Sequence, residues 1–372
     1  MTSAPNEPSP KRSPDSSEPS SVLLRGAGGI EVRAGKRADD EERDAFAAAH
    51  PNATFFHRAG WRRVVRRVFG HAPADLVAWR GGAIVGFLPM MSCRGAFGRR
   101  NLISMPYGVY GGPVAADEAV EQALVEEAVR LADQSRVGHL ELRYMRDPGP
   151  DLVGSSLYYT FIKDLPDDPA DVLARMPKKA RAEARKARDR HGLELSEGAW
   201  YVEDLYRMFV KNKHQLGSPA LPPRHFRELL AEFGKDVRVH LVRKEREPLA
   251  AVMSFCAGDT LIAYYSGTES GVDREYSASN FMYLSLQEWG VEHGFKRFDF
   301  GRSRRDAGAF KFKTHQGFEP TPLNYRYHLV QDRRLPAFTP SNPKTRVLRE
   351  TWSRMPAWCA RRLSDRLATY LP

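Results

Sequence analysis

The chain of 372 residues is long enough for two domains or one duplicated domain, and its apolar content of 42% is sufficient for their cores. No apolar run is as long as a membrane-spanning helix, and the N-terminus lacks the apolar segment of a signal peptide, so we expect a cytoplasmic protein. Cys93, Cys256 and Cys359 lie far apart in apolar settings, which excludes a disulfide framework and a cysteine metal site; we expect no metal.

The net charge of +11 is concentrated in two segments. Residues 175–190 carry eight Lys/Arg against two acids, a net +6, and residues 331–372 carry nine against three, again +6. The rest of the chain is therefore close to neutral, at 11 − 6 − 6 = −1. Such concentration predicts two surfaces that contact polyanions, namely phosphates, RNA or an acidic membrane face.

The first half of the chain begins with a Ser/Pro-rich tail over residues 1–27, whose composition predicts disorder. Two strand-like runs joined by Gly81-Gly82 predict a hairpin, and "YGVYGGPV" at 107–114 predicts a Gly-rich loop. We expect helices at 38–49, 57–69 and 117–135, and strands at 75–80, 83–92, 100–106, 138–145 and 156–165.

The second half repeats this order after a basic helical connector at 166–192. We expect helices at about 200–215, 223–233 and 278–293, and strands at 236–244, 248–258, 260–268 and 295–301. Corresponding elements lie about 157 to 165 residues apart, which indicates an internal duplication. The pattern predicts an α+β class: two mixed, mostly antiparallel sheets flanked by helices, with one domain at 28–165 and a second at 193–332.

The stretch "GRSRRDAGAFKFKTHQGFEP" at 301–320 has two interpretations. The alternation of Phe310, Lys311, Phe312 and Lys313 is typical of a half-buried strand. A helix that ends at Gly317 explains why a glycine follows the alternating residues, because a glycine in the left-handed conformation commonly terminates a helix. The next residue, Phe318, could then contact Phe312 in the preceding turn. We prefer the helix and keep the strand as the alternative.

Several motifs occur in a characteristic order in the second half: Tyr265 in a strand, Gly294 after a long helix, the strand "FDFG" at 298–301, and the segment Gly308–Lys313. In this order they resemble the FemAB/FemX aminoacyl transferases and their GNAT-related relatives of exopolysaccharide and PEP-CTERM systems, including BioF2-like acetyltransferase domains. The resemblance covers roughly residues 30–330 and implies two GNAT-like domains in tandem. The sequence departs from this pattern in "KTHQGFEP", in lacking a coiled-coil arm, and in lacking the glycine-rich pyrophosphate signature of ordinary GNAT enzymes.

The resemblance also implies site residues. Lys313 would polarise the acyl carbonyl, and Asp299 would orient or deprotonate the amine, or alternatively cap the next turn. The substrate groove would be lined by Tyr265, Arg274, Arg302, Arg305, Phe310, Lys311 and His315. Tyr264 and Tyr265 should point to opposite faces of their strand. No cofactor is expected beyond the acyl donor as co-substrate, which is aminoacyl-tRNA by family, or acyl-CoA or acyl carrier protein by fold.

Two further segments are basic and predicted to be helical. Ala180, Ala184 and Ala187 form an apolar stripe on a helix whose other faces carry the predicted polyanion-binding residues Lys178, Lys179, Arg181, Arg185 and Arg188. In the basic tail at 333–372, Trp352, Met355, Trp358, Leu363 and Leu367 stand among arginines. This tail either lies on an anionic membrane or packs on the domain.

The sequence thus predicts an acyltransferase of the aminoacyltransferase type that acts on an amine of a peptidoglycan or exopolysaccharide precursor. Its partners would be an anionic or lipid-linked precursor and a donor tRNA, with no DNA. One alternative is an acyl-CoA-dependent GNAT enzyme that modifies exported polysaccharide. Another is a non-catalytic scaffold that docks on polyanions or membrane.

Overall fold

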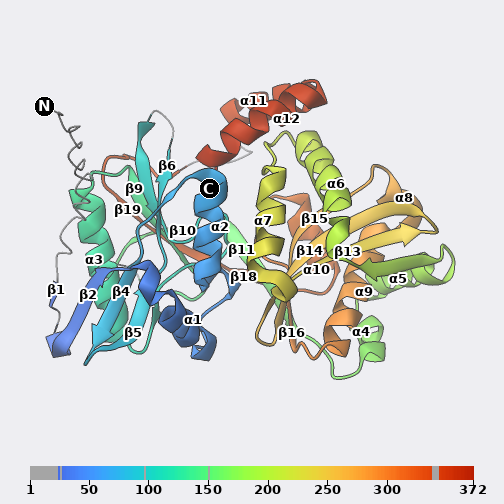
Figure 1. Ribbon diagram of the computed structural model, residues 1–372. Coiled ribbons are helices and arrows are strands. Elements are labelled where there is room, and N and C mark those ends of the chain that lie inside the picture. The colour runs from blue at the N-terminus through green and yellow to red at the C-terminus, as the bar shows by residue number, and fades with distance from the viewer. Residues whose placement is uncertain (1–23, 26, 96–97, 150, 337–342) are drawn as a thin grey trace, which may run out of the picture.

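The computed structural model describes residues 24–25, 27–95, 98–149, 151–336 and 343–372, and most of the predicted N-terminal tail therefore lies outside the described residues. Leu24 and Arg25, which the prediction placed in that tail, instead form β1, paired antiparallel with Val32 and Glu31 of β2. Two α+β halves lie side by side, and a helical hairpin at the end of the chain extends above them (Figure 1).

The first half contains two sheets, in the strand orders β1-β2-β4-β5-β8 and β10-β19-β9-β7-β6-β3. Its hairpin turns at Gly81 and Gly82, which both have positive φ, as a two-residue turn of type I′ requires. The elements are β1 (Leu24–Arg25), β2 (Ile30–Ala34), α1 (Asp40–Ala49), α2 (Ala59–Phe69), β3 (Ala72–Pro73), β4 (Leu76–Arg80), β5 (Ala83–Leu88), β6 (Met91–Arg94), β7 (Arg100–Ile103), β8 (Val114–Ala115), α3 (Glu118–Gln134), β9 (His139–Tyr144), β10 (Val153–Ser155) and β11 (Tyr158–Asp164).

The second half has one large sheet in the order β12-β13-β14-β15-β16-β11-β17, and β18 pairs with β11. Its elements are α4 (Pro169–Arg175), α5 (Lys178–Asp189), β12 (Leu193–Glu197), α6 (Val202–Gln215), α7 (Pro223–Phe233), β13 (Val237–Lys244), β14 (Glu247–Ala257), β15 (Thr260–Thr268), α8 (Val272–Tyr276), α9 (Ala278–Glu292), β16 (Arg297–Asp299), β17 (Ser303–Arg304), α10 (Gly308–His315), β18 (Pro320–Pro322) and β19 (Asn324–Leu329). The tail forms α11 (Pro343–Arg354) and α12 (Ala357–Leu367).

Each half contains one parallel strand pair in an equivalent position. In the first half β7 pairs parallel with β9, so that Ile103 lies opposite Glu141. In the second half β15 pairs parallel with β16, so that Ile262 lies opposite Asp299. The duplicated order of elements in the sequence therefore corresponds to a duplicated sheet topology, and each parallel pair ends beside a carboxylate.

The two halves exchange strands. β11 is the last strand of the first half in sequence, yet it pairs with β16, β17 and β18 of the second half. β19 is the last strand of the second half in sequence, yet it pairs with β9 and β10 of the first. Boundaries drawn along the sequence at 165 and 332 therefore leave two of the three sheets, the one with β9 and the large one with β14, each with a strand supplied by the other half.

One hydrophobic core spans both halves. Phe55, just before α2, stacks on Phe255 of β14 at 4.5 Å between ring centroids, and also contacts Phe233 of α7. Trp61 of α2 packs edge-on against Phe255 at 5.7 Å. Because these rings are fully buried, we expect the halves to be stable together rather than separately.

The segment 308–315 is a helix, as preferred, and the strand alternative is wrong. Its end has the two hydrogen bonds of a Schellman motif: Gly317 N–H donates to Thr314 O at 3.0 Å, and Phe318 N–H donates to Lys313 O at 3.2 Å. Gly317 has φ +81°. The ring of Phe318 packs edge-on against Phe300 at 4.5 Å, so the last turn is fixed on β16 and its following loop.

Candidate functional site

The parallel strands β15 and β16 separate after a short stretch of pairing. They pair only from Thr260 to Ile262 and from Arg297 to Asp299, whereas β15 continues to Thr268. A crevice outside the carboxyl ends of parallel strands is the usual ligand position in α/β sheets. The residues that follow Ile262 and Asp299 therefore form the candidate active site.

A β-bulge in β15 brings two tyrosines to the same side. Met253 lies opposite Tyr265, but the next residue of β14, Ser254, lies opposite Ala263, so Tyr264 is the extra residue. Both tyrosine rings pack against the core that joins the halves, with centroids 4.7 Å apart. The expectation that Tyr264 and Tyr265 point to opposite faces is wrong, because the bulge interrupts the alternation.

Asp299 lies at the carboxyl end of β16, is only 2% exposed, and accepts hydrogen bonds from both halves. Its Oδ1 accepts from Gly301 N–H at 2.6 Å and from Thr160 Oγ1 at 3.4 Å, and its Oδ2 accepts from the Tyr110 hydroxyl at 2.8 Å. Burial raises the pKa of Asp299, while these donors and Lys313 act in the opposite direction. The carboxylate both caps the following turn, as the sequence alternative held, and joins the two halves.

Lys313 extends from α10 to the loop after β16 and is 8% exposed. Its Nζ donates to three backbone carbonyls: Phe300 O at 2.6 Å, Gly301 O at 3.0 Å and Arg302 O at 3.3 Å. Burial lowers its pKa to about 7, and the charge of Asp299 opposes that shift. The ammonium has three hydrogens and all three are engaged, so in this state Lys313 fixes the loop that carries Arg302.

Arg302 lies half-buried among tyrosines from the exchanged strands. Its Nη1 donates to the Tyr325 hydroxyl at 3.0 Å, and its guanidinium lies over the Tyr158 ring at 4.6 Å. Within the described residues no carboxylate forms an ion pair with it. Burial lowers the pKa of Arg302, whereas Tyr325 and Tyr158 raise it, with a net increase.

A second cation, Lys213 of α6, lies near Arg302. Its Nζ lies over the Phe209 ring at 5.3 Å, and Phe209 packs on Tyr265 of the bulge. Burial lowers the pKa of Lys213, and the charge of Arg302 lowers it further. In the part of the chain that the structure describes, Lys213 has no acidic partner. Two half-buried cations without a carboxylate indicate a place for an anionic group of a substrate.

The other predicted groove residues do not converge on this place. Tyr265 is buried, and its hydroxyl is hydrogen-bonded to His225 Nε2 at 2.9 Å. Phe310 packs edge-on against Tyr159 and Phe161 of β11, so it belongs to the core of α10. Arg305 is exposed, with a hydrogen bond to the Tyr159 hydroxyl, and the remaining three, Arg274, Lys311 and His315, are exposed on helices.

Helix α5 has the predicted apolar stripe, and its basic side chains differ in their contacts. Ala180, Ala184 and Ala187 are buried. Arg188 pairs with Glu288 at 3.1 Å, and Arg181 donates to Ala174 O. Lys178, Lys179 and Arg185 are exposed and have no ion pair among the described residues, so polyanion binding by α5 stays a prediction that rests on these three.

Sequence reasoning did not identify Lys213, Tyr110, Thr160 or Tyr325 as site residues. A signal existed for Tyr110, because it lies in the Gly-rich loop that follows β7, the strand equivalent to β15. No comparable signal marked Lys213, since a lysine near the end of a polar helix is usually solvated.

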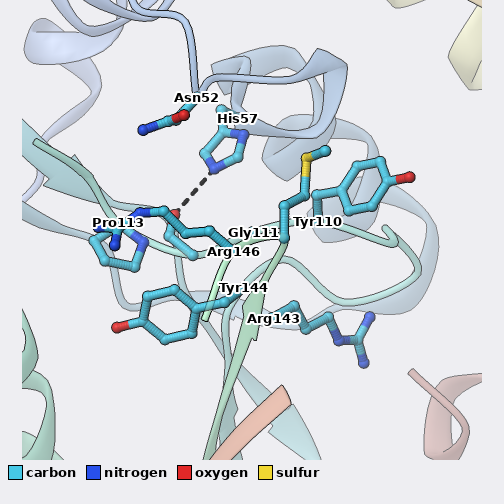
Figure 2. A pocket seen from close by; sticks show the side chains of 10 residues that line it. Asn52, His57, Tyr110, Gly111, Pro113, Arg143, Tyr144 and Arg146 are labelled. Carbon is cyan, nitrogen blue, oxygen red and sulfur yellow. Dashed lines mark hydrogen bonds between the residues drawn. The ribbon is translucent and has the colours of Figure 1, made fainter. Parts of the chain in front are cut away.

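The structure has a small and a large cavity, and neither is lined by Asp299, Arg302 or Lys213. The smaller, of about 50 Å³, lies in the first half around His57, whose Nε2 donates to Gly112 O at 3.0 Å (Figure 2). His57 Nδ1 accepts from Thr54 N–H, and burial lowers the pKa of this histidine to about 4, so it stays neutral and structural. The larger, of about 580 Å³, lies between α6 and the tail helices. Lys313 lines neither cavity.

No arrangement of three or more His, Cys, Asp or Glu side chains in the described residues is suited to hold a metal ion. Of the three cysteines, Cys93 is buried, Cys256 and Cys359 are half-buried, and all are free.

Comparison with known proteins identifies the fold. Residues 174–314 match the acetyltransferase (GNAT) domain model. The structure of FemX aligns with TM-score 0.60 at 12% identity, over 78% of this chain and 96% of that chain. A tandem GNAT protein from the clavulanic acid biosynthesis pathway aligns with TM-score 0.51 at 14% identity, over 81% and 98% of the two chains. A conserved protein of unknown function from Bacteroides thetaiotaomicron aligns with TM-score 0.52 at 12% identity, over 83% and 99%. No curated protein matches the sequence.

Proposed function

We propose that this chain, which has the tandem GNAT fold also seen in FemX and a GNAT acetyltransferase domain at residues 174–314, transfers an acyl group to an amine of an anionic cell-envelope precursor. The observation that carries the proposal is the separation of β15 and β16 after their short parallel pairing, near the two cations Lys213 and Arg302, which form no ion pair among the described residues. The acceptor is a peptidoglycan or exopolysaccharide precursor, whose phosphate or carboxylate pairs with these cations.

The reaction replaces an ester or thioester bond by an amide bond. The neutral amine attacks the acyl carbonyl and forms the N–C bond, the C–S or C–O bond of the donor breaks, and the proton lost by the amine ends on the leaving group. The enzyme contributes orientation of the two reactants and stabilisation of the oxyanion that develops on the carbonyl oxygen.

Lys313 stabilises the oxyanion in this proposal. Of its three acceptors, Arg302 O is the most distant at 3.3 Å and is the one that the acyl oxygen would replace. The other two carbonyls keep the ammonium in place. Asp299 has a positioning role in this proposal. Its carboxylate accepts hydrogen bonds from Gly301 N–H and the Tyr110 hydroxyl, and so fixes the loop between β16 and β17.

The donor is an acyl thioester, coenzyme A or acyl carrier protein, since GNAT domains take acyl-CoA donors and residues 174–314 match that domain. Aminoacyl-tRNA is the second candidate donor, favoured by the exposed cations of α5. A transfer assay with amino-sugar nucleotides and muramoyl peptides as acceptors distinguishes them. Thiol release that depends on the acceptor and survives ribonuclease supports the thioester, whereas product formation that ribonuclease abolishes supports tRNA.

The rival interpretation is a scaffold without catalysis. If neither acyl-CoA nor aminoacyl-tRNA gives acceptor-dependent product, and Lys313→Ala retains the function of the protein in cells, the acyltransferase proposal is wrong. Lys311→Ala is the matched control, because Lys311 is exposed on the same helix and lacks the contacts of Lys313.

A further inference from the structure

The exposed apolar side chains of this protein gather in its tail helices. Eleven large hydrophobic side chains are exposed in the described chain, and seven of them lie between residues 347 and 371: Val347, Leu348, Trp358, Leu363, Leu367, Tyr370 and Leu371. Trp358 is 71% exposed. An eighth, Leu216, lies beside them, because its carbonyl accepts from Arg349 Nε at 3.1 Å. Such a concentration marks an interaction surface rather than ordinary scatter.

This exposure does not come from a loose tail. Ala360, Ser364 and Ala368 are buried along one side of α12 and the turn after it. Ser364 Oγ accepts from Ala220 N–H at 3.2 Å, and the Tyr107 hydroxyl of the first half donates to Ala368 O at 2.9 Å. The hairpin of α11 and α12 therefore packs by one side on the body of the protein and presents its other side outward, above α6 and α7 (Figure 1).

A cavity of about 580 Å³ lies under this hairpin. Its walls are mainly apolar and include Tyr206 and Val210 of α6 together with Trp352 and Trp358 of the tail. Arg361 stands at the same cavity, with its guanidinium 5.8 Å from the Tyr206 ring centroid. The volume is within the range of sites that bind small apolar ligands, and Trp358 connects the cavity to the exposed surface.

The positive charge of the tail favours an anionic partner. Between residues 346 and 371 the tail carries six arginines against Glu350 and Asp365, a net +4. Glu350 pairs with Arg346 at 3.5 Å, and Arg354, Arg362 and Arg366 are exposed. Apolar side chains interspersed with arginines match an anionic lipid surface, which attracts cations near its headgroups and takes up apolar side chains below them. None of the helices in the described part of the chain has the length and apolar character needed to cross a bilayer.

We propose that the α11–α12 hairpin is a docking surface for an anionic lipid bilayer, with Val347, Leu348 and Trp358 inserted at the interface and the cavity beneath them taking one acyl chain. Docking in this way keeps the protein at the membrane, where a lipid-linked acceptor is concentrated. The proposal concerns binding and does not depend on the transfer reaction.

The experiment is co-sedimentation of the full chain with vesicles of pure phosphatidylcholine and with vesicles in which one-third of the lipid is phosphatidylglycerol. We expect binding to the anionic vesicles that weakens as salt is raised, and much weaker binding to the neutral ones. The triple variant V347S/L348S/W358S and the double variant R362Q/R366Q should each lose about tenfold or more in affinity, from lost apolar insertion and lost charge respectively.

The matched control is Trp200→Ser, because Trp200 is 72% exposed and lies in the short helical turn Ala199–Tyr201, outside the tail. It should bind vesicles as the unchanged chain does. Thermal unfolding of each variant checks that these exposed substitutions leave the fold intact. Equal binding to both kinds of vesicle, unchanged binding by the triple variant, or binding of an acidic protein instead of vesicles would overturn the proposal.

Discussion

The hydroxyl of Tyr110 donates a 2.8 Å hydrogen bond to Asp299 Oδ2, and so joins the Gly-rich loop of the first half to the end of β16 in the second. Tyr110 also hydrogen-bonds the Thr160 hydroxyl on the exchanged strand β11. The candidate site therefore depends on three segments that lie far apart in sequence.

Tyr110→Phe should lower the free energy of unfolding by about 1–3 kcal/mol, because it removes a donor from a buried carboxylate. The loss should increase as pH rises above the ordinary range of a carboxyl, since the charged form of Asp299 needs the donor most. Urea denaturation at several pH values measures both. Tyr370→Phe is the control, because Tyr370 is 46% exposed and should change stability little. An equal effect of the two variants would contradict this role for Tyr110.

The rate of acyl transfer should fall as pH rises through about 7, the pKa of Lys313, because the ammonium is the form that stabilises the oxyanion. The buried histidines His57, His71, His225 and His240 have pKa values of about 3 to 4 and stay neutral in that range. Lys313→Arg should abolish the fall in rate above pH 7, because arginine stays charged, and Lys313→Met should lower the rate most below pH 7, where the lysine is an ammonium. If the fall in rate above pH 7 persists in Lys313→Arg, the titrating group is a residue other than Lys313.

Lys213→Met should raise the free energy of unfolding, because burial disfavours the charged ammonium, and should weaken binding of pyrophosphate used as a probe of the anion site. Lys213 is a half-buried cation that Arg302 repels. Its removal therefore eliminates this repulsion in the free protein and removes an attraction to the bound anion in the complex. Lys211→Met is the control, since Lys211 is exposed on the same helix and pairs with Glu269 at 2.6 Å. Destabilisation by Lys213→Met, or unchanged pyrophosphate binding, counts against the anion site.

Gly317→Ala should destabilise the protein by about 1–2 kcal/mol, because φ is +81° and a Cβ there would lie 2.9 Å from Pro177 Cδ. Since α10 also positions Lys313, transfer should slow in parallel. Gly308→Ala on the same helix is the control: its φ is ordinary, a Cβ would meet nothing within 4 Å, and stability should be unchanged or slightly higher. Thermal unfolding of both variants measures the difference.

The two halves should not fold alone. A chain that ends after Leu165 leaves β9 without β19, and separates Phe55 from Phe255. We expect residues 24–165 and residues 166–372 to be unfolded or insoluble when produced separately, and the whole chain to unfold in one transition by circular dichroism and by tryptophan fluorescence. Two resolved transitions, or a native spectrum from either half, would show that the exchanged strands are dispensable.

Local pattern in the sequence determined the helices, the hairpins and their repetition. The glycine after Gln316 predicted the helix end that the structure shows, and the alanine spacing of α5 predicted its buried face, because these features depend on neighbours a few residues away.

Only the tertiary structure decided which strand joins which sheet, that a bulge places Tyr264 beside Tyr265, and that Lys213 lies near Arg302. It also decided that Lys313 is bound to three carbonyls rather than free. The physical reason is that strand pairing and burial of charge are set by contacts between distant segments. The periodicity of one segment does not identify the segment with which it pairs.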